Sequence, residues 1–412
     1  MEHRHESCFS SPFLSVDEAA LLATRDLVPV SDVEEVALDD CCGRVLARGC
    51  TAPAPIPSFA NSAMDGYAVR KGDLTGEGPW TLPVIATVKA GPTTARAYPA
   101  GGAIRILTGA AVPAGFDTVL RQEDCVRVGD SVRVNERPRV GLNVRAIGEY
   151  ADQGEVLLFA ETELKPHHIG LLASIGFDRV LVRRKIRVGI ASIGDELSTS
   201  QGELAHGSIF DSNRPLLKAL AHSPSSEIQD FGVFRDDEES LRGLFAAAHG
   251  LDVLVTSAGA SVGEFDLVRS VLNGIGGTID AWQVAMKPGK PLLFGHFGKT
   301  RFLGLPGNPM AAFVGYKLFG EPISQRLQGR INKLPLATRA ISGFDSSRHP
   351  MRMEFVPVVI DSYDDQDRPV LRRVSHLGPG SLVPLAKADG LAVIRPGTEP
   401  LNVGQKLEWR RF

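Results

Sequence analysis

Four times between Lys185 and Lys317, an apolar run ends in a turn that is rich in Gly or Pro and carries charge. The runs are KIRVGIASI, LDVLVTS, AWQVAM and RFLGL; the turns hold Gly194-Asp195-Glu196, AGASVGEFD, KPGKP and PGNP. Short continuous apolar runs are typical of buried parallel strands. Because ligands of open α/β sheets bind at the carboxyl ends of the strands, we expect the four turns to meet at one edge. Carboxylates and lysines together there favour a phosphorylated ligand with a metal ion or an oxyanion.

The rest of the chain predicts further domains, since 412 residues exceed the usual size of one. The Pro-rich segment TAPAPIPSF marks a boundary near Thr51, because proline at this density continues neither a helix nor a central strand. From Gly66 to Val140, and again after Gln328, short apolar segments alternate with turn residues, which predicts two β domains. Helices are expected from Ser15, whose spacing to Glu18 fits a capping box, and over 167–176, 215–222, 239–249 and 265–275.

Composition excludes several classes of protein. Lys+Arg 45 against Asp+Glu 48 gives a net charge of −3, which argues against a general nucleic-acid binder. No apolar run is long enough to span a bilayer, and the N-terminal residues show no apolar signal region, so a cytoplasmic protein is expected. The five cysteines form no CxxC pair. A zinc site at Cys41, Cys42 and Cys50 is a weak alternative to incidental thiols, because adjacent cysteines rarely bind one tetrahedral ion.

The four turns contain candidate ligand-binding residues. Asp195 and Glu196 are either charges at a helix N-terminus or ligands of Mg²⁺. The loop over 258–266 is expected to bring backbone N–H groups to phosphate, although it is neither a P-loop nor a GxGxxG fingerprint. Lys287 and Lys290 are either a solvated face or, given the prolines around them, fixed phosphate ligands.

Other motifs leave two interpretations open. Asp65, in MDGYAVR, is a turn residue or part of a site. Thr108 ends a strand or offers backbone N–H groups to an anion. In SIFDSNRP, either Asp211 or Ser212 caps a helix whose start is also a possible anion site. Pro309 fits the first turn of a helix after a stiff GLPGNP turn.

From about Phe13 onward the chain resembles the molybdopterin molybdenumtransferases, that is, MoeA and the E domain of gephyrin. The shared strings are NSAMDGYAVR, IRILTGAAVP, GDEL, IFDSNR, SVGEFD, VAMKPGKPLLFG and GLPGNP. The resemblance implies a multidomain α/β plus β fold. Its parts are an extended domain from residues 13–50 and 142–182, an inserted β domain over 51–141, a MogA-like α/β domain with a mostly parallel sheet over 183–328, and a small C-terminal β domain over 329–412.

The resemblance also implies an activity: insertion of molybdate into adenylylated molybdopterin with release of AMP, assisted by Mg²⁺ or a similar ion. It implies a homodimer whose cleft combines the α/β domain of one subunit with the inserted β domain of the other. A MogA-type adenylyltransferase and molybdoenzymes or their chaperones are possible partners. Implied catalytic residues are Asp65, Glu196 and Asp266, the last two also as metal ligands; implied binding residues are Thr108, Asp236, Ser261, Lys287, Lys290, Pro306, Pro309 and Arg352.

The chain departs from the family pattern at several positions. Ala60 replaces an Asp, Tyr150 replaces the carboxylate of a GED string, and Gln283 replaces a Lys. Ala258 and Ala260 alter the SGGVSVG loop, and Pro357 and Pro379 stand where Arg and Ser are common. Two hypotheses follow: an active transferase, or a divergent relative that carries molybdopterin or scaffolds other proteins without turnover. The retained Asp65, Glu196, Asp266, Lys287 and Lys290 favour the transferase. A MogA-like adenylyltransferase would explain the α/β domain alone.

Overall fold

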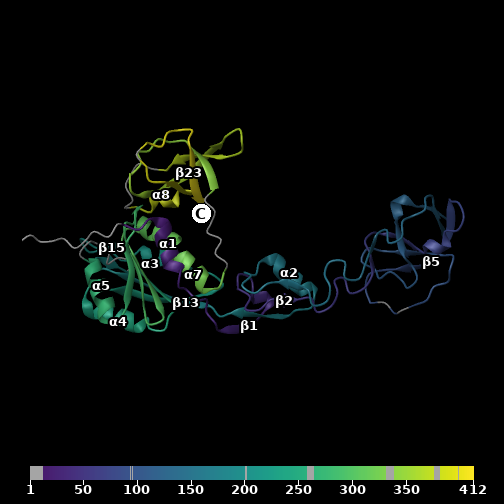
Figure 1. The fold of residues 1–412 in the computed structure, drawn as a ribbon, viewed down its shortest axis with the longest axis horizontal. Coiled ribbons are helices and arrows are strands. Elements are labelled where there is room, and N and C mark those ends of the chain that lie inside the picture. Colours follow the sequence, from purple (N-terminus) through teal and green to yellow (C-terminus); the bar gives the residue numbers. More distant parts are fainter. Residues whose placement is uncertain are drawn as a thin grey trace, which may run out of the picture. The chain divides into compact units, whose positions relative to one another are not determined.

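The computed structural model describes residues 13–92, 94, 96–199, 202–257, 264–330, 338–374, 381–397 and 399–412, without the side chains of 264–266. The chain divides into two compact units. The first comprises Met1–Ala47, Glu161–Pro166 and Arg179–Phe412, and the second comprises Arg48–Ala160 and His167–Asp178 (Figure 1). None of the described helices is both long and apolar enough to cross a membrane.

The centre of the first unit is a six-stranded sheet in the order β16-β13-β17-β21-β20-β18. Its strands are β13 (Ile186–Ile193), β16 (Ser226–Phe234), β17 (Val253–Ser257), β18 (Thr278–Gln283), β20 (Pro291–Phe297) and β21 (Thr300–Leu305). β13, β17 and β21 are parallel, as predicted for their apolar runs, and β16, which was not predicted, is parallel to β13. Because β20 is antiparallel to both β21 and β18, the carboxyl end of β18 lies at the same edge as those of the parallel strands.

The prediction that AWQVAM forms a buried parallel strand was wrong. β18 lies at the edge of the sheet, is mostly half-buried, and pairs antiparallel with β20. The reason is that PLLFGHF is itself a strand that follows the KPGKP turn directly. A parallel partner requires a crossover connection of a dozen or more residues, which this turn cannot supply.

Helices cover both faces of this sheet (Figure 1). The predicted crossover helices are confirmed as α3 (Asn213–Ala221), α4 (Glu238–Ala247) and α5 (Glu264–Gly274), and the chain continues through α6 (Pro309–Gly315), a π-helical turn and α7 (Glu321–Leu327). Alternate residues of β13 enter two cores: Ile190 packs with α3 and α6 residues, and Ala191 packs with α4 and α5 residues. α1 (Val16–Thr24) has the expected capping box, in which Ser15 and Glu18 bond reciprocally.

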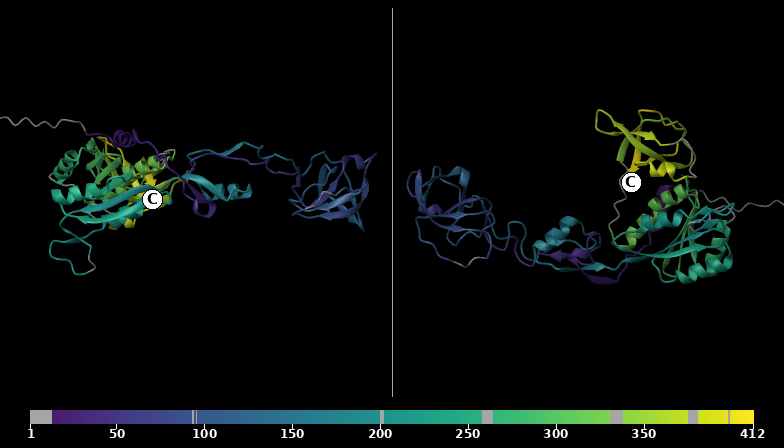
Figure 2. Two further views of the ribbon diagram at one scale, coloured as in Figure 1. Left: turned by 90° about the horizontal axis from the view of Figure 1, so that it is seen from below. Right: turned by 180° about the vertical axis from the view of Figure 1, so that it is seen from behind.

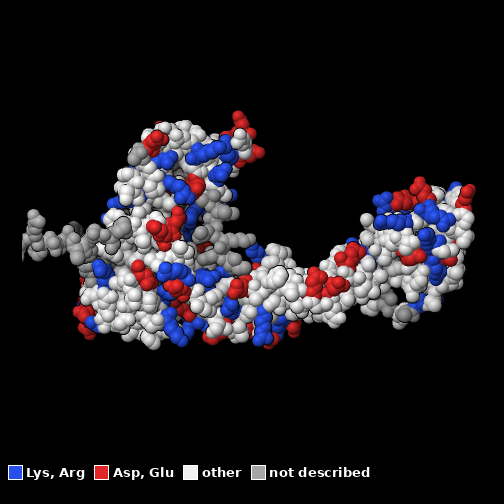
Figure 3. All heavy atoms as spheres, viewed as in Figure 1, with Lys and Arg blue, Asp and Glu red and all other residues white. Residues whose placement is uncertain are grey.

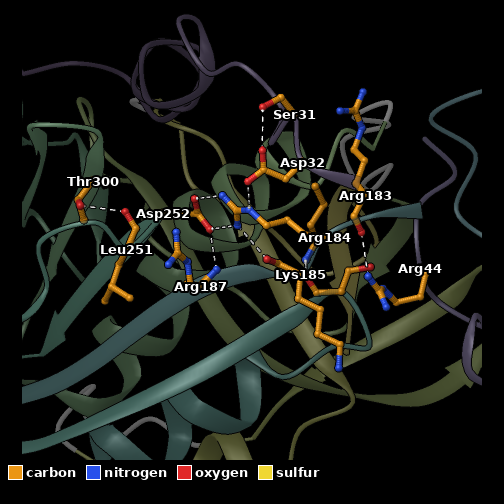
Figure 4. A network of polar contacts seen from close by, with 12 residues as sticks. Ser31, Asp32, Arg44, Arg183, Arg184, Lys185, Arg187, Leu251, Asp252 and Thr300 are labelled. Carbon is orange, nitrogen blue, oxygen red and sulfur yellow. Dashed lines mark hydrogen bonds and ion pairs between the residues drawn. The ribbon is translucent and has the colours of Figure 1, made fainter. Parts of the chain in front are cut away.

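A cluster of ion pairs lies at the amino-terminal ends of β13 and β17 (Figure 4). The Arg184 guanidinium donates to both carboxylate oxygens of Asp252, at 2.7 and 2.9 Å, and to Asp32 at 3.1 Å. Asp252 also accepts the Arg187 N–H at 2.7 Å. Hydrogen bonding to Asp252 holds the pKa of Arg184 above its usual value. The cluster ties β13 and β17 to β12 (Arg179–Arg183), which pairs with β1 (Val33–Ala37).

We expect Asp252→Ala to lower the free energy of unfolding by about 2–3 kcal/mol, because it removes the bidentate acceptor of Arg184 and the acceptor of the Arg187 N–H. Urea denaturation followed by circular dichroism measures this loss. The matched control is Asp361→Ala, which breaks a bidentate-capable pair with Arg372 whose side chains are 52% and 59% exposed. Exposed pairs contribute about 0–1 kcal/mol. Equal losses in the two variants would contradict a structural role for the cluster.

A second six-stranded sheet forms the predicted C-terminal β domain, yellow in Figure 2. Its order is β19-β23-β24-β22-β26-β25, and β23 also pairs with β25. The strands are β19 (Met286–Lys287), β22 (Thr338–Ser342), β23 (Met353–Tyr363), β24 (Pro369–Arg373), β25 (Gly390–Ile394) and β26 (Lys406–Arg411), with the short helix α8 (Val383–Ala386). Because β19 belongs to the KPGKP turn, the lysine turn is part of this sheet as well as of the α/β domain.

The second unit contains the predicted inserted β domain, with strand order β7-β4-β6-β5-β9-β8. The strands are β4 (Gly66–Val69), β5 (Trp80–Val88), β6 (Ala103–Ile106), β7 (Thr118–Arg121), β8 (Val126–Val128) and β9 (Ser131–Val134). Short pairs join β2 (Cys50–Thr51) to β11 (Val156–Leu158) and β3 (Asn61–Ser62) to β10 (Val144–Arg145), and α2 (Pro166–Ser174) confirms the helix expected there. On the face drawn in Figure 3, acidic and basic side chains are intermixed.

Candidate functional site

A cavity of about 420 Å³ lies at the carboxyl ends of β13, β17 and β21. Glu196 lines it from the turn after β13, and Ser257 lines it from the last position of β17. Gly307 lines it from the turn after β21, and Pro309 lines it from the first position of α6. The remaining lining residues are Leu197, Ile209, Phe210, Asp211, Ser212, Asn213, Ser381, Leu382 and Val383. The turns after β13 and β21 therefore meet at one edge, as predicted. Residues 258–263 of the turn after β17 lie outside the described residues, and the KPGKP turn does not line this cavity. The C-terminal domain adds Ser381–Val383, which sequence reasoning missed.

Glu196 reaches this cavity through an unusual turn. Gly194 has φ +149°, and an added Cβ there would lie 2.5 Å from Oε2 of Glu196, so the carboxylate is folded back over a glycine. The chain then enters β14 (Leu197–Ser198), which pairs with β15 (Ile209–Phe210). The alternative that Asp195 and Glu196 begin a helix is thus wrong. Glu196 is exposed and lines the cavity, whereas Asp195 is exposed but does not.

A buried polar network forms the wall of the cavity beside Glu196. Asp211, whose side chain is 2% exposed, accepts from Ser192 Oγ at 2.9 Å and from the backbone N–H and Nε of Arg214 at 3.2 and 2.8 Å. Arg214 also donates to Asp230 at 2.7 Å. Asp211, rather than Ser212, therefore bonds the start of α3. Since an arginine already satisfies this carboxylate, Asp211 is a poor candidate for a cation ligand.

Asn213 connects the first turn of α3 to two neighbouring turns. Its Nδ2 donates to Ser257 Oγ at 2.6 Å and to the Gly307 carbonyl at 2.8 Å, and Ser257 Oγ donates to the Pro306 carbonyl at 3.5 Å. Asn213 Oδ1 is buried and has no hydrogen-bond partner among the described residues. Pro309 is at the first position of α6, where Asn308 caps the helix by accepting from the N–H groups of Met310 and Ala311. These contacts hold Pro306 and Pro309 in place around the cavity.

The two predicted lysines lie in a turn packed against α6: an added Cβ at Gly289 would lie 3.6 Å from the Ala311 Cβ. Lys287 Nζ is 3.2 Å from Glu354 Oε2, and Glu354 is 8% exposed. Lys290 Nζ lies 4.3 Å from the centroid of the Phe13 ring. Arg352 is half-buried and directly precedes Met353, which pairs with Met286. The structure therefore places Lys287 on β19 and Arg352 directly before β23, the strand that pairs with β19. It adds Glu354, which sequence reasoning did not single out.

Three predicted positions remain to be placed. Asp236 is half-buried and follows β16 at the same edge of the sheet. Ser261 lies outside the described residues, as do Ala258, Ala260 and Pro379, and the Asp266 side chain is also outside them although its backbone is in α5.

In the second unit, the structure joins two predicted residues that are 43 positions apart. Asp65 Oδ1 accepts from the backbone N–H and from the hydroxyl of Thr108, each at 2.7 Å. The Thr108 N–H, which the sequence offered as a donor to an external anion, therefore donates to Asp65 instead. These hydrogen bonds, backbone first, lower the pKa of Asp65, and the charge of Arg105 acts in the same direction. Asp65 is exposed and stays ionised at neutral pH, so it combines a fixed position with a solvent-facing charge.

The described residues fit a Mg²⁺ ion that would bind together with a phosphorylated ligand, rather than one held by protein side chains alone. No cluster of three His, Cys, Asp or Glu side chains that could hold a metal occurs among the described residues, which include Cys41, Cys42 and Cys50. Mg²⁺ is commonly held by one or two carboxylates together with substrate phosphates and water. Glu196 supplies one exposed carboxylate at the cavity. Asp266 is in the first turn of α5, the helix that follows β17 in the chain.

The departures from the family pattern fall in both units. Ala60 and Tyr150 are in the second unit, where Tyr150 is 61% exposed and its N–H donates to the Ile56 carbonyl at 2.8 Å. Gln283 ends β18, in register with Pro291, and Pro357 lies within β23. Gln283 is thus beside the lysine turn, where a neutral side chain replaces the expected cation.

Comparison with known proteins assigns three segments of the chain to known family regions. Residues 14–176 match the MoeA N-terminal region (domains I and II), 189–326 match a family described as a probable molybdopterin binding domain, and 339–412 match the MoeA C-terminal region (domain IV).

Named relatives give the same result. The chain is 36% identical to a molybdopterin molybdenumtransferase of Haemophilus influenzae over 83% of this chain and 85% of that protein. It is 30% identical to the one of Bacillus subtilis over 92% and 89%. A crystal structure of the molybdopterin biosynthesis MoeA protein from Pyrococcus horikoshii OT3 superimposes with a TM-score of 0.82 at 26% identity, covering 97% of this chain and all of that one. The chain therefore belongs to the molybdopterin molybdenumtransferase family.

Proposed function

We propose that this protein inserts molybdate into adenylylated molybdopterin and releases AMP, as a transferase of molybdenum cofactor biosynthesis. The family relationship over nearly the whole chain supports this activity. The observation that supports a location for this activity is the cavity at the strand ends. It is lined by the exposed carboxylate of Glu196 and by the Gly307 turn, whose carbonyl accepts a hydrogen bond from Asn213. A phosphorylated nucleotide at the carboxyl edge of an α/β sheet fits the general rule for such folds.

In this proposal the nucleotide and pyrophosphate of the substrate lie over the strand ends. Lys287, Lys290 and Arg352 attract the phosphates, and the turns at Pro306 and Pro309 orient the adenylyl group by their fixed backbone. Glu196, with Asp266, positions the pyrophosphate linkage and would hold Mg²⁺. When bound, Mg²⁺ neutralises phosphate charge as the phosphoanhydride bond breaks. Asp236 and Ser261 complete the contacts to the substrate, and Asp65, oriented by Thr108, faces the reacting end.

We further propose a cytoplasmic homodimer. Asp65 and Thr108 lie in one compact unit, and Glu196, Lys287 and Lys290 lie in the other. A dimer in which the inserted β domain of one subunit serves the α/β domain of its partner would complete each cleft. An adenylyltransferase of the MogA type would supply the substrate, and molybdoenzymes or their chaperones would receive the product.

The decisive test measures AMP release from purified adenylylated molybdopterin with and without molybdate, in the presence of Mg²⁺. We expect release to depend on both ions. Tight binding of the substrate without molybdate-dependent release would contradict the proposed activity and favour a carrier role. Titration with molybdate also tests the effect of Tyr150 and Gln283, whose replacement of a carboxylate and a lysine is expected to raise the molybdate concentration needed for half-maximal release.

We expect Lys290→Met to weaken binding of adenylylated molybdopterin at least tenfold, about 1.4 kcal/mol, with little change in unfolding temperature. Lys287→Met should weaken binding similarly but also destabilise the fold by about 1–2 kcal/mol, because the buried Glu354 carboxylate loses its partner. Isothermal titration calorimetry and thermal denaturation separate these effects. Lys299→Met is the control, since Lys299 is exposed in the hairpin at the opposite edge of the sheet. Unchanged affinity in both lysine variants would contradict this assignment.

A further inference from the structure

A second cavity, of about 230 Å³, lies in the C-terminal β domain. It is lined by four cationic residues, Arg339, Arg348, Arg395 and Lys406, and by the single carboxylate of Glu408. It shares no lining residue with the cavity at the strand ends and contains none of the positions that the sequence motifs singled out. The site at the strand ends therefore does not account for this cationic cavity.

Most of its positive charge is not neutralised within the protein. Arg395 donates to both oxygens of Glu408, at 2.9 and 3.2 Å, so this carboxylate is already engaged. Arg339 is the cross-strand partner of Glu408. No hydrogen bond or ion pair joins the side chains of Arg339, Arg348 or Lys406 to any described residue, and Arg348 Nε is buried without a partner. Like charges gathered in this way repel one another, and a bound anion would relieve the repulsion.

The fold holds Arg348 in this place. The Gly397 N–H donates to the His349 carbonyl at 3.2 Å, and Ser346 and Leu401 exchange backbone hydrogen bonds of 2.8 and 2.9 Å. An added Cβ at Gly397 would lie 3.2 Å from Arg348 Cδ, so the glycine leaves room for the arginine stem. The floor of the cavity is aliphatic, with Leu401 and Leu407 buried. An apolar floor lowers the local dielectric response and strengthens attraction between the cations and an anion.

We propose that this cavity is a binding site for a diphosphate group, either as free pyrophosphate or as part of a nucleoside diphosphate. The planar arginine fork binds phosphate oxygens in pairs, and a diphosphate carries more charge and more oxygens than a carboxylate or a single phosphate. At about 30 Å³ per water, the space equals roughly eight water molecules, enough for a diphosphate but not for a whole nucleotide. A nucleoside would extend past Arg339 and Lys406, which are exposed.

Calorimetric titration of the full chain tests this site, with EDTA present and ionic strength held constant. The probes are pyrophosphate, ADP and orthophosphate. We expect pyrophosphate or ADP to bind at least tenfold more tightly than orthophosphate; binding of ADP alone would identify the nucleotide as the source, and binding of pyrophosphate alone the free ion. Absence of binding by both diphosphates, or no preference over orthophosphate, would overturn the proposal.

Substitutions test whether the diphosphate binds in this cavity. Arg339→Gln and Arg348→Gln should each weaken binding at least tenfold. Glu408→Gln should strengthen it severalfold, because Arg395 then loses its bidentate partner and keeps only the exposed Asp17 at 3.8 Å. The gain in the last variant cannot arise from misfolding. Arg372→Gln, which removes an exposed arginine of the same domain, should leave affinity unchanged. The double variant Lys287→Met/Lys290→Met should still bind. Loss of binding in that double variant, or weaker binding in Glu408→Gln, would place the anion elsewhere and refute this site.

Discussion

Glu196→Gln is expected to lower the rate of molybdate-dependent AMP release at least 100-fold, equivalent to about 3 kcal/mol of transition-state stabilisation, without loss of folding. Glutamine has the size of glutamate but no charge, so it cannot hold a hard cation against the pyrophosphate. Steady-state assays at saturating substrate measure the effect, and circular dichroism verifies the fold.

The neighbouring carboxylate supplies the control for Glu196. Asp195 is also exposed, but it does not line the cavity, so Asp195→Asn should keep most of the activity. Gly194→Ala gives an independent check, because a Cβ at φ +149° would displace the Glu196 carboxylate and should reduce activity even though Glu196 is retained. Equal activity in Glu196→Gln and wild type would remove Glu196 from the mechanism.

Asp65→Asn is expected to be as damaging as Glu196→Gln, at least 100-fold, because the charge held in place by Thr108 is lost. Asp130→Asn, in the exposed turn between β8 and β9 of the same domain, should remain active. The pKa of Asp65 is lowered, so its carboxylate remains charged until the pH falls below the usual range for aspartate. Activity should therefore not depend on titration of this group near pH 7.

The two inactive variants together test the proposed dimer. If each cleft takes Asp65 from one subunit and Glu196 from the other, a heterodimer of Asp65→Asn and Glu196→Gln subunits has one intact cleft and one doubly defective cleft. Random exchange at equal concentrations makes half of the dimers mixed, so about a quarter of wild-type activity should return. No recovery despite subunit exchange, verified by mass spectrometry of differently tagged chains, would show that the two residues do not meet across subunits.

Local sequence patterns were sufficient for most elements. The apolar runs around Ile190 and Val255 predicted buried parallel strands because both faces of this sheet are covered by helices. Their carboxyl ends reach one edge because parallel strands end together. The N-cap at Ser15 and the place of Pro309 in the first turn of α6 were also predicted, since both depend on residues only a few positions away.

Strand pairing and contacts between distant residues required the tertiary structure. The apolar run of β18 did not by itself distinguish it from a buried parallel strand, because its partner is set by the strand that follows the short KPGKP turn. The sequence by itself determined the family, the element types and the edge at which Glu196 lies. Only the tertiary structure decided that Asp65 meets Thr108, that Lys287 meets Glu354, and that unpaired cations of the C-terminal domain line one cavity. The reason is physical: these contacts depend on register and packing between segments far apart in the chain, which no local periodicity encodes.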